Sequence, residues 1–184
     1  MRLFVAIALP VDIRQMLCAL QGGVQGARWV DGDNLHLTLR FIGEADGVQL
    51  RDLDAELSTI EFPAFETAVC GLGTFERRQR VHMLWADIET SPALTALRER
   101  VEAAVMRAGY GPEGRKFKAH VTLARFKPGA GSDIGEYLEA NNIFARGNFP
   151  VRNCSLYRSH LNRDGAKYET LFTYGLRDVS AGVS

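Results

Sequence analysis

Two histidines, each followed two residues later by a threonine, are the residues of this 184-residue chain most suited to chemistry. Residues 36–43 read His-Leu-Thr-Leu-Arg-Phe-Ile-Gly, and residues 120–127 read His-Val-Thr-Leu-Ala-Arg-Phe-Lys. Side chains alternate between the two faces of a β-strand, so His36 shares a face with Thr38, and His120 shares one with Thr122. Each motif therefore predicts a strand that is anchored by apolar side chains on one face and presents an imidazole and a hydroxyl on the other.

Two such motifs facing each other would suit the transfer of a phosphoryl group from a cyclic ester to water. This hydrolysis needs a base for the water, an acid for the leaving oxygen and donors for the non-bridging oxygens. Histidine titrates near neutrality, so one neutral and one protonated imidazole can coexist, and threonine hydroxyls can donate to phosphate oxygens. The pattern predicts His36 and His120 as an acid–base pair, with Thr38 and Thr122 as phosphate ligands.

Two other interpretations of the motifs are structural histidines and a metal site. A single His-x-Thr arises easily by chance, but two copies in matching strand contexts, using two of only four histidines, favour catalysis. Zinc would need further ligands at close spacing, and neither motif has a nearby cysteine, second histidine or paired carboxylate. We therefore expect no metal ligands and no cofactor.

Composition sets further bounds on the function. The chain is 46% apolar and 24% charged, and no linker-like segment divides it, which fits one large domain or two small lobes with a shared core. A formal net charge of zero argues against non-specific binding along a long nucleic acid. A small anion or one end of an RNA remains a possible ligand. Three scattered cysteines indicate a reducing compartment, and no apolar run matches a membrane span or a signal peptide. We expect a cytoplasmic protein.

The elements that must position the motifs mix strands and helices. Hydrophobic periodicity and turn residues predict strands at 3–9, 35–42, 65–72, 83–88, 117–126, 151–158 and 167–174, and helices at 10–20, 48–60, 92–108 and 134–140. A basic segment at 77–80 joins two of the strands, and a turn at 162–165 joins the last two. Frequent hairpins favour an α+β fold with antiparallel sheets over a doubly wound parallel sheet.

Two arginines near the motifs are candidates for further phosphate contacts. Strict alternation puts Arg125 on the face opposite His120, so it reaches the motif face only if the strand twists or bulges. It is either a phosphate ligand or one half of a structural ion pair. Alternation puts Arg40 on the face of His36, farther along the strand, where we expect a solvated side chain in preference to a phosphate contact.

Other basic and aromatic residues are weaker candidates. Two basic groups either attract RNA or are simply solvated loops, and these are Arg77, Arg78 and Arg80, and Arg115, Lys116 and Lys118. Phe4 and Trp29 either stack on a base or belong to the core, and the core interpretation is favoured.

Beyond the motifs, the chain resembles the RNA 2′,3′-cyclic phosphodiesterase family, the LigT-type 2′-5′ RNA ligases, within the 2H phosphoesterases. The resemblance runs nearly from end to end of the chain. It is carried by residues 2–7, 29–30, 34–39, 41–43, 71–73, 84–85, 119–125, 156–159 and 165–169.

The resemblance implies a single bilobal α+β domain over residues 1–184, with one His-x-Thr-x motif in each lobe, at 36–39 and 120–123. Two antiparallel-rich sheets would face a central cleft lined by the motifs, with the helices on the outside. The implied partner is RNA with a 2′,3′-cyclic phosphate end, or a cyclic nucleotide. We expect a monomer that does not bind membranes.

The implied reaction is metal-independent opening of the cyclic phosphate to a 2′-phosphate. By motif position, His36 is the proton donor to the leaving O3′ and His120 is the proton acceptor that activates water. Thr38, Thr122 and Arg125 would hold phosphate oxygens. Two alternatives stay open, namely a 2′-5′ RNA ligase that joins tRNA-half-like ends at the same site, and a non-catalytic module that binds RNA ends or nucleotides.

Overall fold

The computed structural model describes residues 1–127, 130, 134–162 and 165–177, and its strands form two antiparallel sheets. Sheet A has the strand order β3-β1-β8-β9, and sheet B has the order β2-β6-β5-β4-β7. The strands are β1 Arg2–Ala8, β2 Ala27–Trp29, β3 His36–Glu44, β4 Phe65–Arg77, β5 Arg80–Ile88, β6 His120–Phe126, β7 Arg146–Val151, β8 Asn153–Asn162 and β9 Gly165–Gly175. The helices are α1 Val11–Ala19, α2 Gly47–Leu57, α3 Pro92–Arg107, α4 Ile134–Asn141 and the short 3-10 helix η1 Gly32–Asn34. The predicted α+β class with antiparallel sheets is confirmed.

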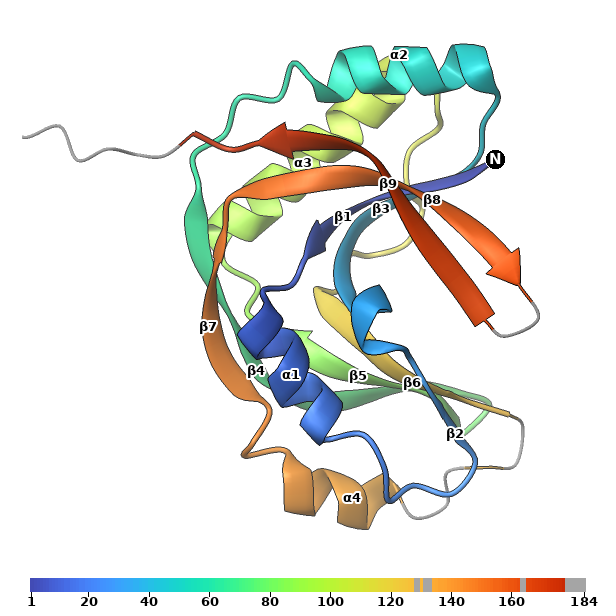
Figure 1. The fold of residues 1–184 in the computed structure, drawn as a ribbon, viewed down its shortest axis with the longest axis vertical. Helices are drawn as coiled ribbons and strands as arrows, with labels where there is room; N and C mark the ends of the chain where they lie inside the picture. Colours follow the sequence, from blue (N-terminus) through green and yellow to red (C-terminus); the bar gives the residue numbers. More distant parts are fainter. Residues whose placement is uncertain (128–129, 131–133, 163–164, 178–184) are drawn as a thin grey trace, which may run out of the picture.

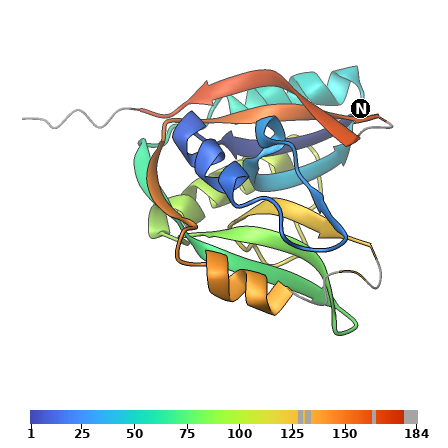
Figure 2. The ribbon, with the colours of Figure 1, turned by 60° about the horizontal axis from the view of Figure 1, so that its bottom comes forward.

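The two motif strands come together where the sheets meet. β3 is the edge strand of sheet A, β6 lies one strand in from the edge of sheet B, and the two contact each other. Figures 1 and 2 show the sheets as two layers, with α2 and α3 towards one end of the molecule and α4 at the other. Buried apolar side chains from both sheets and from α3 form one continuous core. The fold therefore places one motif in each sheet, on neighbouring strands.

Some elements of the fold differ from those that the sequence predicts. β2 is only three residues long, which is too short for alternation to show. β7 contains Gly147 and Pro150, both poor strand formers, so the predicted strand at 151–158 covers the end of β7 and most of β8. The predicted strand at 117–126 begins only at His120.

The hairpin of β4 and β5 is longer than predicted. It closes within the basic segment 77–80, where Arg78 and Gln79 have φ angles of 53° and 60°. Two positive φ angles are typical of a type I′ turn, which favours glycine or asparagine, so these residue types gave no turn signal. β8 and β9 flank the turn predicted at 162–165, of which residues 163–164 lie outside the described residues.

Each motif strand contains a β-bulge at the fourth residue of its motif. In sheet A, Thr38 pairs with Ala6 and Arg40 pairs with Val5, so the residue between them has no partner on β1. In sheet B, Thr122 pairs with Trp85 and Ala124 pairs with Leu84, so Leu123 has none on β5. A bulge adds one residue to a strand and shifts the alternation of the side chains that follow, which in β3 extends to a second register shift at Ile42. The face reached by the fifth motif residue is therefore the opposite of the one that strict alternation predicts.

The bulge overturns the prediction for Arg40. This residue is turned away from His36 and its side chain is only 8% exposed, so it is neither solvated nor a phosphate contact. Phe41 instead lies in an exposed position after the shift. The prediction for Arg40 was wrong because it assumed strict alternation. Leu39 and Arg40 are consecutive and both buried, and a strand without a bulge would expose one of them.

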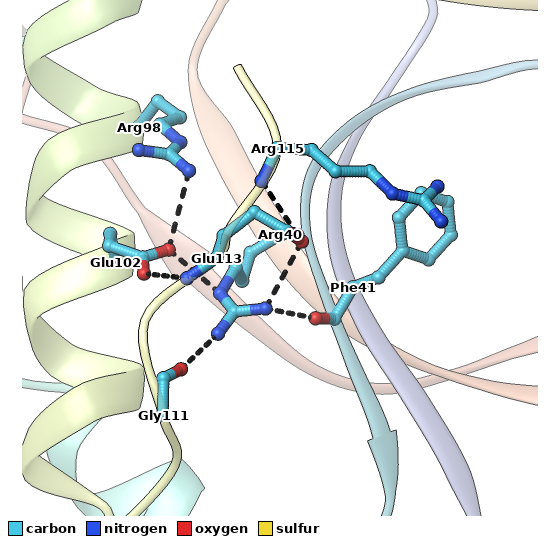
Figure 3. A network of polar contacts seen from close by, with 7 residues as sticks. All are labelled: Arg40, Phe41, Arg98, Glu102, Gly111, Glu113 and Arg115. Carbon is cyan, nitrogen blue, oxygen red and sulfur yellow. Dashed lines mark hydrogen bonds and ion pairs between the residues drawn. The ribbon is translucent and has the colours of Figure 1, made fainter. Parts of the chain in front are cut away.

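Arg40 is the centre of a buried network of charges (Figure 3). Its Nε lies 2.7 Å from Glu102 Oε2 as an ion pair whose hydrogen-bond alignment is poor, and its Nη1 lies 3.2 Å from Glu113 Oε2. Its Nη2 donates to the carbonyl of Gly111 at 2.6 Å. Arg98 adds a second cation, 3.4 Å from Glu102, so the four charges balance.

This network ties three parts of the chain that position the motifs. Arg40 belongs to β3, Glu102 belongs to α3, and Glu113 belongs to the segment that leads into β6. Glu102 also accepts from the backbone N–H of Glu113 at 2.7 Å. The strand of the first motif is therefore anchored to the segment that precedes the second.

Replacement of Arg40 by methionine should destabilise the protein by about 3–5 kcal/mol, because it removes the buried cation that pairs with Glu113 and leaves Glu102 with Arg98 alone. The loss is measured as the change in the free energy of unfolding in urea. Adding Glu113→Gln to Arg40→Met should restore part of the stability, since the carboxylate that has lost its cation is then removed.

The matched control is Arg51→Met on the exposed face of α2, which should change the unfolding free energy by less than about 0.5 kcal/mol. A loss below about 1 kcal/mol for Arg40→Met would show that the network contributes little, as surface ion pairs usually do.

Candidate active site

His36 and His120 lie close enough to each other to interact electrostatically. The first residue of β3 is His36 and the first residue of β6 is His120, and both side chains are partly buried. The positive charge of a protonated His120 contributes to lowering the pKa of His36. The structure therefore brings the two predicted catalytic residues into one site, although they lie about half a chain length apart in sequence.

Both imidazoles are held in the same way. His36 Nδ1 lies 2.6 Å from the carbonyl oxygen of Asn34, and His120 Nδ1 lies 2.7 Å from that of Lys118. A carbonyl can only accept, so Nδ1 carries the proton in the neutral ring and Nε2 has a free lone pair. Each histidine therefore presents Nε2 as the nitrogen that can take up or give up a proton.

The residues that supply these carbonyls are themselves anchored. Asn34 Nδ2 donates to the carbonyl of Ala166 in β9 at 2.7 Å. Lys118 Nζ lies 2.7 Å from Asp87 Oδ1 and 5.0 Å from the ring centre of Trp85. Each ring orientation is thus set by contacts that reach other strands of its own sheet.

Aromatic rings surround both histidines, and most of these rings have no local signal in the sequence that marks them as part of a site. Three rings lie near His36, and their centroid distances are 5.0 Å for Phe4, 6.4 Å for Tyr157 and 5.0 Å for Tyr168. Two lie near His120, at 5.1 Å for Phe75 and 6.1 Å for Trp85. Alternation places these residues on the motif faces, and this signal becomes specific only when the pairing of the strands is known.

A glycine makes room for one of these rings. Gly73 on β4 pairs with Trp85 on β5, and a Cβ atom at this glycine would lie 2.4 Å from the indole. Only glycine leaves space for the ring to lie flat across the sheet, where it contacts His120.

The surroundings lower the pKa of both histidines. Burial is the largest cause in each case, because it disfavours the charged imidazolium. The hydrogen bond from Nδ1 to a backbone carbonyl raises each pKa and offsets part of the effect. The guanidinium of Arg125 lowers both, so its charge reaches both rings.

The two motif threonines keep their hydroxyls free of strong partners. Thr122 Oγ1 donates to Met83 Sδ at 3.5 Å, which is a weak hydrogen bond. Within the described residues, Thr38 makes no side-chain hydrogen bond, and like Thr122 it is partly exposed. Both hydroxyls can therefore donate to an anion without losing a strong internal bond.

Arg125 reaches the motif face because of the bulge at Leu123. Its neighbour Ala124 is buried while Arg125 is exposed, which returns Arg125 to the face of Thr122. Its charge also acts on Tyr168, on the opposite sheet. No carboxylate within the described residues pairs with Arg125, so the structural ion pair considered from the sequence is not formed there.

The other candidates lie farther from the two imidazoles or are covered. Phe4 is 3% exposed and stacks on Tyr157 at 5.2 Å, and Trp29 packs towards Tyr137 of α4 at 6.0 Å. Both belong to packed clusters, as the core interpretation predicted. Arg77 and Arg80 face each other at the tip of the β4–β5 hairpin.

Nowhere in residues 1–127, 130, 134–162 and 165–177 do three or more His, Cys, Asp or Glu side chains gather as metal ligands. Within the same residues, no helix combines the length and the apolar character that a membrane span requires.

Removal of the Arg125 charge should raise the pKa of both histidines. A nearby cation disfavours the imidazolium, so Arg125→Gln makes protonation easier at both rings. The measurement is an NMR titration of the imidazole ring protons in the free protein. In the wild type, both histidines should titrate below the ordinary value of about 6.5.

Arg51→Gln on α2 removes the same charge far from the motifs in sequence and serves as the control. It should leave the pKa of both histidines unchanged. Unchanged titrations in Arg125→Gln would mean that its guanidinium does not lie over the site.

Comparison with known proteins agrees with this geometry. The family model described as LigT like Phosphoesterase matches residues 7–85 and 87–168. Over 155 residues, the chain is 32% identical to an RNA 2′,3′-cyclic phosphodiesterase of Aeropyrum pernix, covering 83% of this chain and 87% of that protein. It is 29% identical to one of Archaeoglobus fulgidus, with 93% and 98% covered.

A solved structure shows the same fold. The crystal structure of Escherichia coli LigT complexed with 3′-AMP superposes with a TM-score of 0.76 at 27% sequence identity, covering 95% of this chain and 97% of that one. The sheet order, the two motif strands and the family match lead to one conclusion: the chain belongs to the LigT-like phosphoesterase family.

Proposed function

We propose that this protein is an RNA 2′,3′-cyclic phosphodiesterase that opens cyclic phosphate ends to 2′-phosphates by acid–base catalysis. The observation that carries the proposal is the matched pair of histidines, each with Nδ1 bound to a backbone carbonyl and Nε2 left to exchange a proton. The names of the relatives from Aeropyrum pernix and Archaeoglobus fulgidus support the substrate class. The 3′-AMP bound to Escherichia coli LigT supports a nucleotide phosphate as the ligand.

In the proposed reaction, His120 accepts a proton from water while the water oxygen attacks phosphorus. The bond from phosphorus to O3′ breaks as His36 donates its proton to O3′, which leaves the phosphate on O2′. Attack and departure lie in line, so the acid and the base must stand on opposite sides of the phosphate. The contribution of one histidine from each of two sheets supports this arrangement.

Thr38, Thr122 and Arg125 are proposed to hold the non-bridging oxygens, where negative charge increases in the transition state. The hydroxyls are weakly engaged and the guanidinium has no carboxylate partner in the described chain, so all three can turn to the phosphate. A bound phosphate also favours the imidazolium and counteracts the lowered pKa of His36. Side chains supply the acid, the base and the donors, so we propose that no metal ion takes part.

The site is proposed to be complete in one chain. Both motif strands contribute apolar residues to one core that joins the two sheets, so we propose a single bilobal domain that acts as a monomer. The three cysteines are free thiols, which fits the proposed cytoplasmic location.

The purified protein should hydrolyse a dinucleotide that ends in a 2′,3′-cyclic phosphate, with EDTA present, and release only the 2′-phosphate. His36→Ala and His120→Ala should each lower kcat by about 10²–10⁴, because each removes one proton-transfer group. Chromatography against 2′- and 3′-phosphate standards identifies the product.

Formation of a 3′-phosphate, or dependence on a divalent ion, would contradict the mechanism. Tight binding with no turnover would indicate a module that binds RNA ends. The ligating direction would use the same groups in reverse, and no observation on this chain favours it.

A substrate with sulfur in place of O3′ separates the two histidine roles. Thiols are far more acidic than alcohols (the cysteine thiol has a pKa near 8.5), so a thiolate leaves without help from an acid. His36→Ala should therefore cleave this substrate at a rate within about tenfold of the wild type, whereas His120→Ala should stay slow. The oxygen substrate, assayed in parallel, is the control. Rescue of His120→Ala in place of His36→Ala would exchange the two roles.

A further inference from the structure

A row of four residues crosses sheet B on the side of the proposed catalytic site. Arg28 on β2 pairs with Arg125 on β6, which pairs with Met83 on β5, which in turn pairs with Phe75 on β4. Directly opposite residues of antiparallel strands project from the same face. Met83 accepts from Thr122 and Phe75 contacts His120, so this face is the one that carries the second motif.

The neighbouring row confirms this assignment of faces. Trp29, Ala124 and Leu84 form the next row across the same strands, and Ala124 and Leu84 are fully buried. Trp29 contacts Tyr137 of α4, so this second row faces the helix. Arg28 therefore projects from the face opposite α4, beside Arg125.

The two arginines stand next to each other without a counter-charge in the described chain. Directly opposite residues have Cβ atoms about 5 Å apart, and like charges at this spacing repel. Neither arginine has a carboxylate partner within the described residues, whereas Arg14, Arg107 and Arg177 each have one. Arg28 is exposed and lies on the edge strand of the sheet. A bound anion would relieve the repulsion between the pair.

We propose that Arg28 binds the phosphodiester that precedes the terminal nucleotide of the RNA. This subsite rests on the proposed function, because Arg125 is then engaged with the reacting phosphate. Arg125 lies on β6, the strand that begins with His120, whereas Arg28 lies on the next strand, β2, at the edge of the sheet, so Arg28 lies farther from the reacting phosphorus. An RNA strand leaving the site across β6 and β2 passes Arg125 first and Arg28 second. The preferred substrate class is then an oligonucleotide end and not a mononucleotide.

The experiment compares two dinucleotides that carry the same 2′,3′-cyclic phosphate end. One has an ordinary internucleotide phosphodiester, and the other has a neutral methylphosphonate at that position. In the wild type, kcat/KM should be about five- to tenfold higher for the charged dinucleotide, which corresponds to one charge-assisted hydrogen bond at an exposed site. In Arg28→Gln this ratio should fall close to one.

Two further variants show whether the effect belongs to Arg28. Arg51→Gln removes the same charge from α2 and should keep the wild-type ratio. Arg125→Gln should lower kcat/KM for both dinucleotides and leave the ratio intact, because it acts on the shared cyclic phosphate. A wild-type ratio near one, or a ratio in Arg28→Gln equal to that of the wild type, would overturn the subsite.

Failure of the proposed function is recognised separately. The wild type would then not hydrolyse a nucleoside 2′,3′-cyclic phosphate or either dinucleotide. In that case, calorimetric titration with the two dinucleotides tests Arg28 by binding alone. Tighter binding of the charged dinucleotide that disappears in Arg28→Gln would support the subsite, and equal binding of both by the wild type would refute it.

Discussion

The β-bulge in each motif strand is the constraint on which the site depends. Without it, a strand that begins with a histidine would place Arg40 and Phe126 on the motif face and would turn Arg125 into the core. The extra residues, Leu39 and Leu123, reverse the alternation at the same point of both motifs. One strand thereby buries an arginine that stabilises the fold, and the other exposes an arginine to the two histidines. The two halves of the site share their geometry and differ in their chemistry.

The contacts around the two histidines restrict the orientation of both imidazole rings. Each ring is bound through Nδ1 to the carbonyl two residues earlier, and aromatic neighbours pack around it. The Arg40 network joins β3, α3 and the segment before β6, so it connects the supports of both motifs (Figure 3). The two groups that we propose to act on opposite sides of one phosphorus would have to keep their separation, and a packed core common to both sheets fixes the strands that carry them.

The unpaired positive charges of the described chain include two on the motif face of sheet B, whereas other arginines are paired with carboxylates. The formal net charge is zero, yet Arg28 and Arg125 lie together on the motif face of sheet B without carboxylates from the described chain. Arg14, Arg107 and Arg177 are bound to carboxylates away from the motifs. A local excess of cations on one face of a neutral protein suits the proposed recognition of one end of an RNA, since counter-ion release from a long duplex is not required.

The sequence by itself determined the two motifs, their strand character and the α+β class, because two-residue periodicity and a duplicated pattern are local signals. It also suggested the interpretation of His36 and His120 as a pair. It did not determine the face of Arg40, the route by which Arg125 reaches the histidines, or the short strand β2 that places Arg28 beside Arg125. These depend on which residues pair across strands, and a bulge is invisible in a single strand, because it exists only as a mismatch of register with its neighbour. The tertiary structure alone decided which side chains meet.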